Sequence, residues 1–177
     1  MQGPENLIAH VKEHFPDYTV VPIKAEDVVF EERVRMNCFY CGKYNTCWKC
    51  PPKIPDIDFK KMFGEYDNIA FVYCRYYFTE ETYTQVRNES TNELHKTLLQ
   101  LEGFLWENDN STALSFIGGS CKLCKNGCGK ERCNNPYKAR TPMEATGMNV
   151  VKTAAKYGIE VKFPPTDHII RLGMILW

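Results

Sequence analysis

Apolar residues recur at helical spacing in two segments of the chain, and each segment predicts an amphipathic helix. The first helix spans residues 4–15, and the second spans residues 80–107. Their apolar stripes consist of Leu7, Ile8, Val11 and Phe15, and of Tyr83, Val86, Leu94, Leu98, Leu101 and Leu105. Capping residues indicate two shorter helices, one that follows Asp56 or Asp58 and one over residues 149–157.

Runs of β-branched, aromatic and apolar residues predict five strands. They span residues 18–23, 27–35, 68–77, 112–117 and 168–176. Because the long helix lies between the third and fourth strands, these three elements form a candidate βαβ unit, which is expected to be right-handed and parallel. We therefore expect an α/β or α+β fold, with one compact domain over residues 1–177 and two cysteine-rich loops, at 38–52 and 118–140.

A further helix start is indicated at residues 141–144, which read Thr-Pro-Met-Glu. Thr141 is a suitable N-cap, Pro142 suits the first helical position, and Glu144 completes a capping box. On this interpretation the side chain of Glu144 has a structural role.

Eight of the nine cysteines lie in two short groups. The first group has the spacing C-x2-C-x5-C-x2-C and consists of Cys38, Cys41, Cys47 and Cys50. The second has the spacing C-x2-C-x3-C-x4-C and consists of Cys121, Cys124, Cys128 and Cys133. Since four thiolates suit a tetrahedral zinc site or an iron–sulfur cluster, we predict that each group holds one metal centre. The ninth, Cys74, lies within a predicted strand and is expected to be a buried, small hydrophobic residue.

Disulfides are the main alternative to metal ligation. Bridges within either group would close only short loops and would stabilise the chain little. The first six residues lack a basic region followed by an apolar stretch, so we expect no secretory signal, and no apolar run predicts a membrane span. Lysine plus arginine equals aspartate plus glutamate, 22 each, which argues against nucleic-acid binding. We therefore expect a cytoplasmic protein, in which thiols stay reduced.

The spacing favours two iron–sulfur clusters, of the [4Fe–4S] type, and leaves zinc as the alternative. Zinc sites usually pair C-x-x-C turns across a longer insert than the five residues found here, and Cys50-Pro51 is similar to the Cys-Pro that ends ferredoxin motifs. Basic residues near both groups would offset the charge of anionic centres. They are Lys43, Lys49, Lys53, Lys122, Lys125, Lys130, Arg132, Lys138 and Arg140. Aromatic residues of the first loop would exclude water, namely Phe39, Tyr40, Tyr44 and Trp48.

The second cysteine group is part of a longer signature. It consists of Gly118-Gly119-Ser120-Cys121, Cys124, Cys133, Pro136, Lys138-Ala139-Arg140, Met143-Glu144-Ala145 and Gly147, with Cys47-x-x-Cys50-Pro51-Pro52 upstream. From about Cys38 to the C-terminus, the chain thereby resembles an uncharacterised family of predicted metal-binding proteins that is common in anaerobic archaea and bacteria. The resemblance implies a cysteine-bound metal centre, iron–sulfur in kind, and no known reaction. The chain departs from the family pattern at Thr141-Pro142 and in the interval before Cys128; without Cys128, the second centre would have three cysteines and one open iron.

Three functions are consistent with these features. The leading hypothesis is a small redox protein whose two clusters exchange electrons with a redox partner protein. The second is a zinc-stabilised interaction module with closed, structural sites. The third is an iron–sulfur enzyme with an open iron at the second site, for which Arg140 and Glu144 are candidate helper residues. His10 and His14, four residues apart, are expected to be a solvated pair; the sequence predicts neither a substrate nor the oligomeric state.

Overall fold

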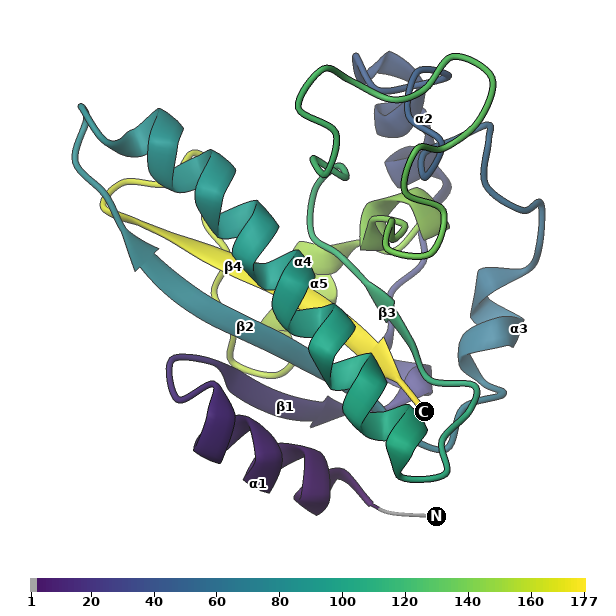
Figure 1. The fold of residues 1–177 in the computed structure, drawn as a ribbon, viewed down its shortest axis with the longest axis vertical. Helices are drawn as coiled ribbons and strands as arrows, with labels where there is room; N and C mark the ends of the chain where they lie inside the picture. Colours follow the sequence, from purple (N-terminus) through teal and green to yellow (C-terminus); the bar gives the residue numbers. More distant parts are fainter. Residues whose placement is uncertain (1–2) are drawn as a thin grey trace.

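A computed structural model describes residues 3–177, and a four-stranded sheet lies at its centre (Figure 1). The strands are β1 (Thr19–Ile23), β2 (Ile69–Tyr77), β3 (Leu114–Phe116) and β4 (His168–Leu176). Their order in the sheet is β1-β2-β4-β3, and each neighbouring pair is antiparallel. The expectation of no secretory signal rests on the first six residues. Two of these, Met1 and Gln2, lie outside the residues that the structure describes.

The centre of the sheet is formed by β2 and β4, which pair over nine residues from Ile69 opposite Leu176 to Tyr77 opposite His168. The predicted succession of strand, long helix and strand is present as β2, α4 (Tyr83–Glu107) and β3. However, β4 lies between β2 and β3, so these two parallel strands are not hydrogen-bonded to each other. The expected mixture of helix and sheet is confirmed, and the antiparallel pairing makes it an α+β arrangement.

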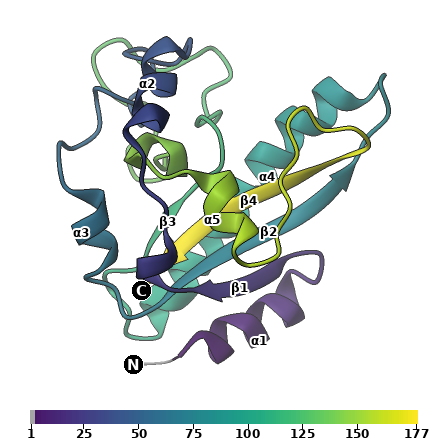
Figure 2. The same ribbon diagram turned by 180° about the vertical axis from the view of Figure 1, so that it is seen from behind.

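Both faces of the sheet are covered, which explains why β2 and β4 are apolar on successive residues. Helices α1 (Pro4–His14) and α4 lie on one face (Figure 1), and α4 packs its leucine stripe there with Ala70 and Val72 of β2. On the other face (Figure 2), Ile69 and Phe71 pack against short elements. These are α3 (Phe59–Phe63), the 3₁₀ turn η2 (Met143–Thr146) and α5 (Val150–Ala155).

The strand predicted over residues 27–35 is wrong. A 3₁₀ turn, η1 (Ala25–Asp27), leads into a short extended stretch, and helix α2 (Glu32–Tyr40) follows. The extended stretch pairs with the segment after η2, because Glu31 N–H donates to the Gly147 carbonyl at 2.9 Å and Asn149 N–H donates to the Val29 carbonyl at 2.7 Å. Its apolar alternation therefore reflects contact with a neighbouring loop, and not membership of the sheet.

The capping box predicted at Thr141 is also wrong. The residues after Pro142 form only the 3₁₀ turn η2, which has no side-chain cap. The backbone is held instead by the end of β3, since Ile117 N–H donates to the Thr141 carbonyl and Met143 N–H donates to the Ile117 carbonyl. The other short helices are confirmed, with Asp58 as the cap of α3 and Asn149 as the cap of α5. Within residues 3–177, no helix is long and apolar enough to cross a membrane.

Candidate metal centre

The two cysteine-rich loops lie side by side at one end of the molecule, although they are far apart in the sequence (Figures 1 and 2). The first loop continues from α2, whose C-terminal turn carries Cys38, and the second follows β3. The indole Nε1 of Trp48 donates a hydrogen bond to the Gly129 carbonyl at 2.7 Å, which joins one loop to the other. The fold therefore brings the two cysteine groups into a single region.

Three thiols line the smaller of two cavities in this region, which has a volume of about 280 Å³. They belong to Cys38, Cys41 and Cys50, and Glu144 of η2 lines the same cavity. The Sγ atom of Cys38 lies 3.8 Å from the main-chain oxygen of Glu144. The end of α2 and the turn η2 thus meet at the wall of this cavity.

Five thiols line the larger cavity, which has a volume of about 620 Å³. They belong to Cys47, Cys121, Cys124, Cys128 and Cys133. All eight predicted ligands therefore surround two cavities, in sets of three and five where the sequence predicted four and four. Lys43 lines both cavities, which places them next to each other.

All nine cysteines lie among residues 3–177, and all nine are free thiols. Within that described range, no group of three or more histidine, cysteine, aspartate or glutamate side chains lies close enough together to hold a single metal ion. The eight thiols of the two groups are instead distributed along the cavity walls.

Cys47 lies between the two cavities, in contact with Cys50 on one side and Cys128 on the other. A hydrogen bond from Cys50 is the main cause that lowers the pKa of Cys47, to about 5, and the backbone amide of Lys49 and the charge of Lys43 lower it further. The pKa of Cys50 is raised, because this thiol donates the hydrogen bond and is buried. Of the two thiols, Cys47 therefore loses its proton more readily, and the thiolate is the form that binds metal.

Polar groups surround the sulfur atoms of the larger cavity. The side-chain amides of Asn135 and Asn134 point to Cys124 Sγ, at 3.1 and 3.9 Å. Burial lowers the pKa of Lys122, and the nearby charges of Arg171 and Arg87 lower it further. These two arginines come from β4 and α4, far from both cysteine groups in the sequence, so sequence reasoning missed them. An amide donor such as Asn135 orients a thiolate, and a cation such as Lys122, which lines this cavity, offsets its charge.

The Glu144 carboxylate is buried, and burial raises its pKa. Among the described residues, its Oε2 atom has no hydrogen-bond partner. The backbone amide of Gly119 and the charge of Arg171 favour its ionised form. We had expected this residue beside the second cysteine group, as part of a cap or as a helper; it lies instead in the cavity of Cys38, Cys41 and Cys50.

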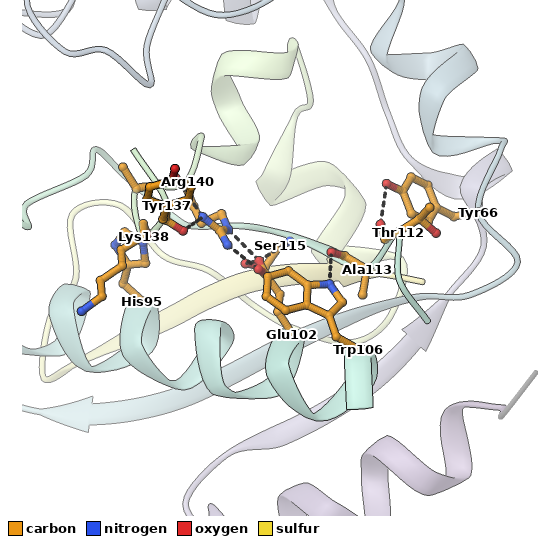
Figure 3. A network of polar contacts seen from close by, with 11 residues as sticks. Tyr66, His95, Glu102, Trp106, Thr112, Ala113, Ser115, Tyr137, Lys138 and Arg140 are labelled. Carbon is orange, nitrogen blue, oxygen red and sulfur yellow. Dashed lines mark hydrogen bonds and ion pairs between the residues drawn. The ribbon is translucent and has the colours of Figure 1, made fainter. Parts of the chain in front are cut away.

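Arg140, the other candidate helper, forms an ion pair with Glu102 of α4, a side chain that is fully buried (Figure 3). Its Nε donates to Glu102 Oε1 at 2.7 Å, and Ser115 N–H donates to the same oxygen at 2.8 Å. His95 lies next to this network, with Nε2 2.8 Å from the Lys138 carbonyl oxygen. Arg140 therefore fastens the second cysteine loop to the sheet and α4, and it lines neither thiol cavity.

The remaining sequence expectations have mixed outcomes. Cys74 is buried in β2, as expected. His10 and His14 stack on each other, with ring centroids 4.4 Å apart, and line neither thiol cavity. Of the four aromatic residues expected to enclose a centre, Trp48 and Tyr44 line the cavities, whereas Phe39 and Tyr40 are exposed.

The fold and the site together define an α+β protein in which cysteines from two distant loops surround adjoining cavities. The sequence profile of a family described as predicted metal-binding protein (DUF2284) matches residues 21–177. The chain therefore belongs to this family, and the resemblance seen in the sequence is confirmed. No curated protein and no solved structure matches the chain.

Proposed function

We propose that this protein binds two iron–sulfur clusters and acts in electron transfer. The proposal is carried by one observation, that eight thiols from two distant loops line two adjoining cavities. Cys38, Cys41 and Cys50 are the ligands available in the small cavity, and the large cavity offers Cys47, Cys121, Cys124, Cys128 and Cys133. A bound cluster would supply one-electron redox chemistry.

The size of the cavities supports clusters over zinc. Four sulfur atoms that each lie about 2.3 Å from one zinc ion lie within about 4 Å of one another. Here the thiols are spread around volumes of about 280 and 620 Å³, which suits a body of several iron and sulfide ions. The amides at Cys124 and the cations Lys43 and Lys122 also fit, because clusters held by thiolates are anionic.

The surface beside the small cavity supports a redox partner protein. A groove next to α2 is lined by Met36 and Phe39, both about half exposed, together with Glu32 and Arg35. Apolar residues surrounded by charges are typical of transient protein contacts. A partner that docks there would lie close to the first cluster. The proposal includes a cytoplasmic location, because free thiols persist in reducing compartments.

The test is metal analysis of protein that has been purified without oxygen. We expect a brown protein with about four irons and four sulfides per centre, which is reduced by dithionite. The Cys41→Ala variant, which leaves two thiols at the small cavity, should lose the cluster there, whereas Cys74→Ala, which removes a buried thiol outside both cavities, should keep all of its iron. A colourless protein with stoichiometric zinc would establish the alternative, a zinc-stabilised module.

A further inference from the structure

The small cavity holds three thiols and one carboxylate. Cys38, Cys41 and Cys50 line it, and Cys47, the remaining member of their group, lines the large cavity. An iron–sulfur cluster of the cubane type has four irons, so three thiolates leave one iron without a protein sulfur. Glu144 is the carboxylate that lines this cavity, and a carboxylate is an anionic metal ligand.

The hydrogen bonding of the Glu144 carboxylate is incomplete, because the Gly119 amide donates to it but the described residues leave one of its oxygens unsatisfied. Its Oε2 atom is buried and, among the described residues, has no hydrogen-bond partner. Arg171 is the nearest cation acting on it, but the Arg171 side chain donates to Ser90 Oγ at 2.8 Å and to the Arg87 carbonyl at 2.6 Å. A buried carboxylate oxygen without a hydrogen-bond partner is unfavourable, and either a proton or a bound metal ion removes this cost.

The backbone holds Glu144 in place. The hydrogen bonds between Ile117 and residues 141 and 143 fix the start of η2 to the end of β3. On the other side, α2 packs against η2, and Cys38 Sγ contacts the main-chain oxygen of Glu144. The backbone of Glu144 is therefore fixed at the wall of the cavity, as the backbone of a preorganised ligand must be.

We propose that Glu144 is the fourth ligand of the metal centre held by Cys38, Cys41 and Cys50, which makes this a three-thiolate, one-carboxylate site. This inference rests on the proposed function, because it assigns a ligand to one of its two clusters. A carboxylate oxygen is a harder ligand than a thiolate sulfur, so the iron bound to Glu144 would differ from the other three irons in its ligand. Glu144 also lines a neighbouring cavity of about 380 Å³, and Arg87 and Arg171 line this cavity too. The iron bound to Glu144 would therefore lie beside this second cavity.

The test compares Glu144→Gln and Glu144→Asp with the wild type after anaerobic purification. Glutamine keeps the shape of the side chain but is a poor iron ligand, so on one-electron oxidation with ferricyanide Glu144→Gln should release about one ferrous ion per chain and show the electron paramagnetic resonance spectrum of an oxidised three-iron cluster. Glu144→Asp keeps a carboxylate and should retain more of this iron. The matched control is Glu160→Gln, at an exposed glutamate, which should leave both the iron content and the spectrum unchanged.

The cluster of the large cavity serves as an internal reference for folding. In every Glu144 variant its signal should persist, whereas Cys41→Ser should remove the small-cavity cluster alone. A wild type with two clusters, and a Glu144→Gln variant with the same iron content and the same spectrum, would overturn the assignment of Glu144 and leave the proposed function intact. A wild type that contains no iron would overturn the proposed function itself.

Discussion

The sheet half and the cysteine half of this molecule are stabilised by different means. In the sheet half, β2 and β4 pair over their whole lengths, and side chains such as Leu98 and Phe71 are completely buried between sheet and helices. In the cysteine half, α2 buries none of its residues, and the second loop has no regular structure between Phe116 and η2. The first half can fold through apolar burial, while the second has little apolar surface to bury.

This contrast indicates what a bound metal contributes. A segment that cannot bury enough apolar surface must gain its order from other interactions. Here these are the hydrogen bond from Trp48 to Gly129 and the ion pair of Arg140 with Glu102, to which the proposed coordination by thiolates would add. Since metal binding to thiolates contributes directly to folding, the cysteine half should depend on its metal, and the sheet half should not.

Metal removal should have the largest effect. Stripping the metal with a strong chelator under anaerobic conditions should withdraw on the order of 10 kcal/mol of binding free energy from the cysteine half. Hydrogen exchange should then become fast in residues 38–52 and 118–138 and stay slow in β2 and β4. Uniformly slow exchange after metal removal would show that the cysteine half is stable by itself.

Breaking the ion pair between the two halves should come next. The Glu102→Gln variant leaves the Arg140 charge without its buried partner, and should lower the free energy of unfolding by about 3–5 kcal/mol in urea denaturation. The control is Arg33→Gln, which removes an exposed ion pair with Glu31 and should cost less than about 1 kcal/mol. Equal effects of the two substitutions would contradict the view that Glu102 anchors the second loop.

Acid should weaken the same junction through His95. Burial is the main cause that lowers the pKa of His95 below its ordinary value, and the charge of Arg140 lowers it further. As the pH falls below about 6.5, the unfolded chain therefore binds a proton that the folded chain does not, and the free energy of unfolding falls by up to about 1.4 kcal/mol per pH unit. Urea denaturation of the wild type and of His95→Gln at pH 7 and 5.5 measures this loss of stability. The free energy of unfolding should decrease less in the variant than in the wild type. Equal decreases in the two proteins would show that His95 is not the source of the acid sensitivity.

The smallest effect is expected from the loss of one tryptophan hydrogen bond, and each half of the molecule has such a bond. Trp48→Phe removes the bond to Gly129 within the cysteine half, and Trp106→Phe removes a similar bond, of 3.0 Å, from Trp106 of α4 to Ala113 next to β3. Each change should cost about 1 kcal/mol. We expect faster iron loss to a chelator from Trp48→Phe and an unchanged rate from Trp106→Phe. Identical rates of iron loss would mean that the two halves open together.

Local sequence signals predicted most of the elements but not their arrangement. The leucine stripe of α4 and the apolar runs of β2 and β4 were sufficient to locate these elements, because their side-chain periodicity depends only on neighbours in the chain. The insertion of β4 between β2 and β3 was not predictable in this way, because pairing between distant strands leaves no local pattern. The same limitation explains the wrong strand at 27–35, whose partner is the loop after η2.

The candidate site was likewise predictable only in part from the sequence. Cysteine spacing identified eight thiols of the right chemistry, since thiolate clusters are a property of composition and spacing alone. It did not reveal that Cys47 and Cys50, two ends of one C-x-x-C turn, line different cavities. Nor did it reveal the place of Glu144, because a glutamate three residues after a threonine fits a capping box equally well.

By itself, then, the sequence determined most of the elements of secondary structure, the family and the eight thiols of the two cysteine groups, since each of these depends on residues that are close along the chain. The tertiary structure alone decided the strand order, the division of the thiols into three and five, and the place of the buried Glu144 carboxylate beside the smaller set. The physical reason is that these features arise from packing between β3, η2, α2 and β4, and contacts across such distances are selected by the whole fold and not by any one segment.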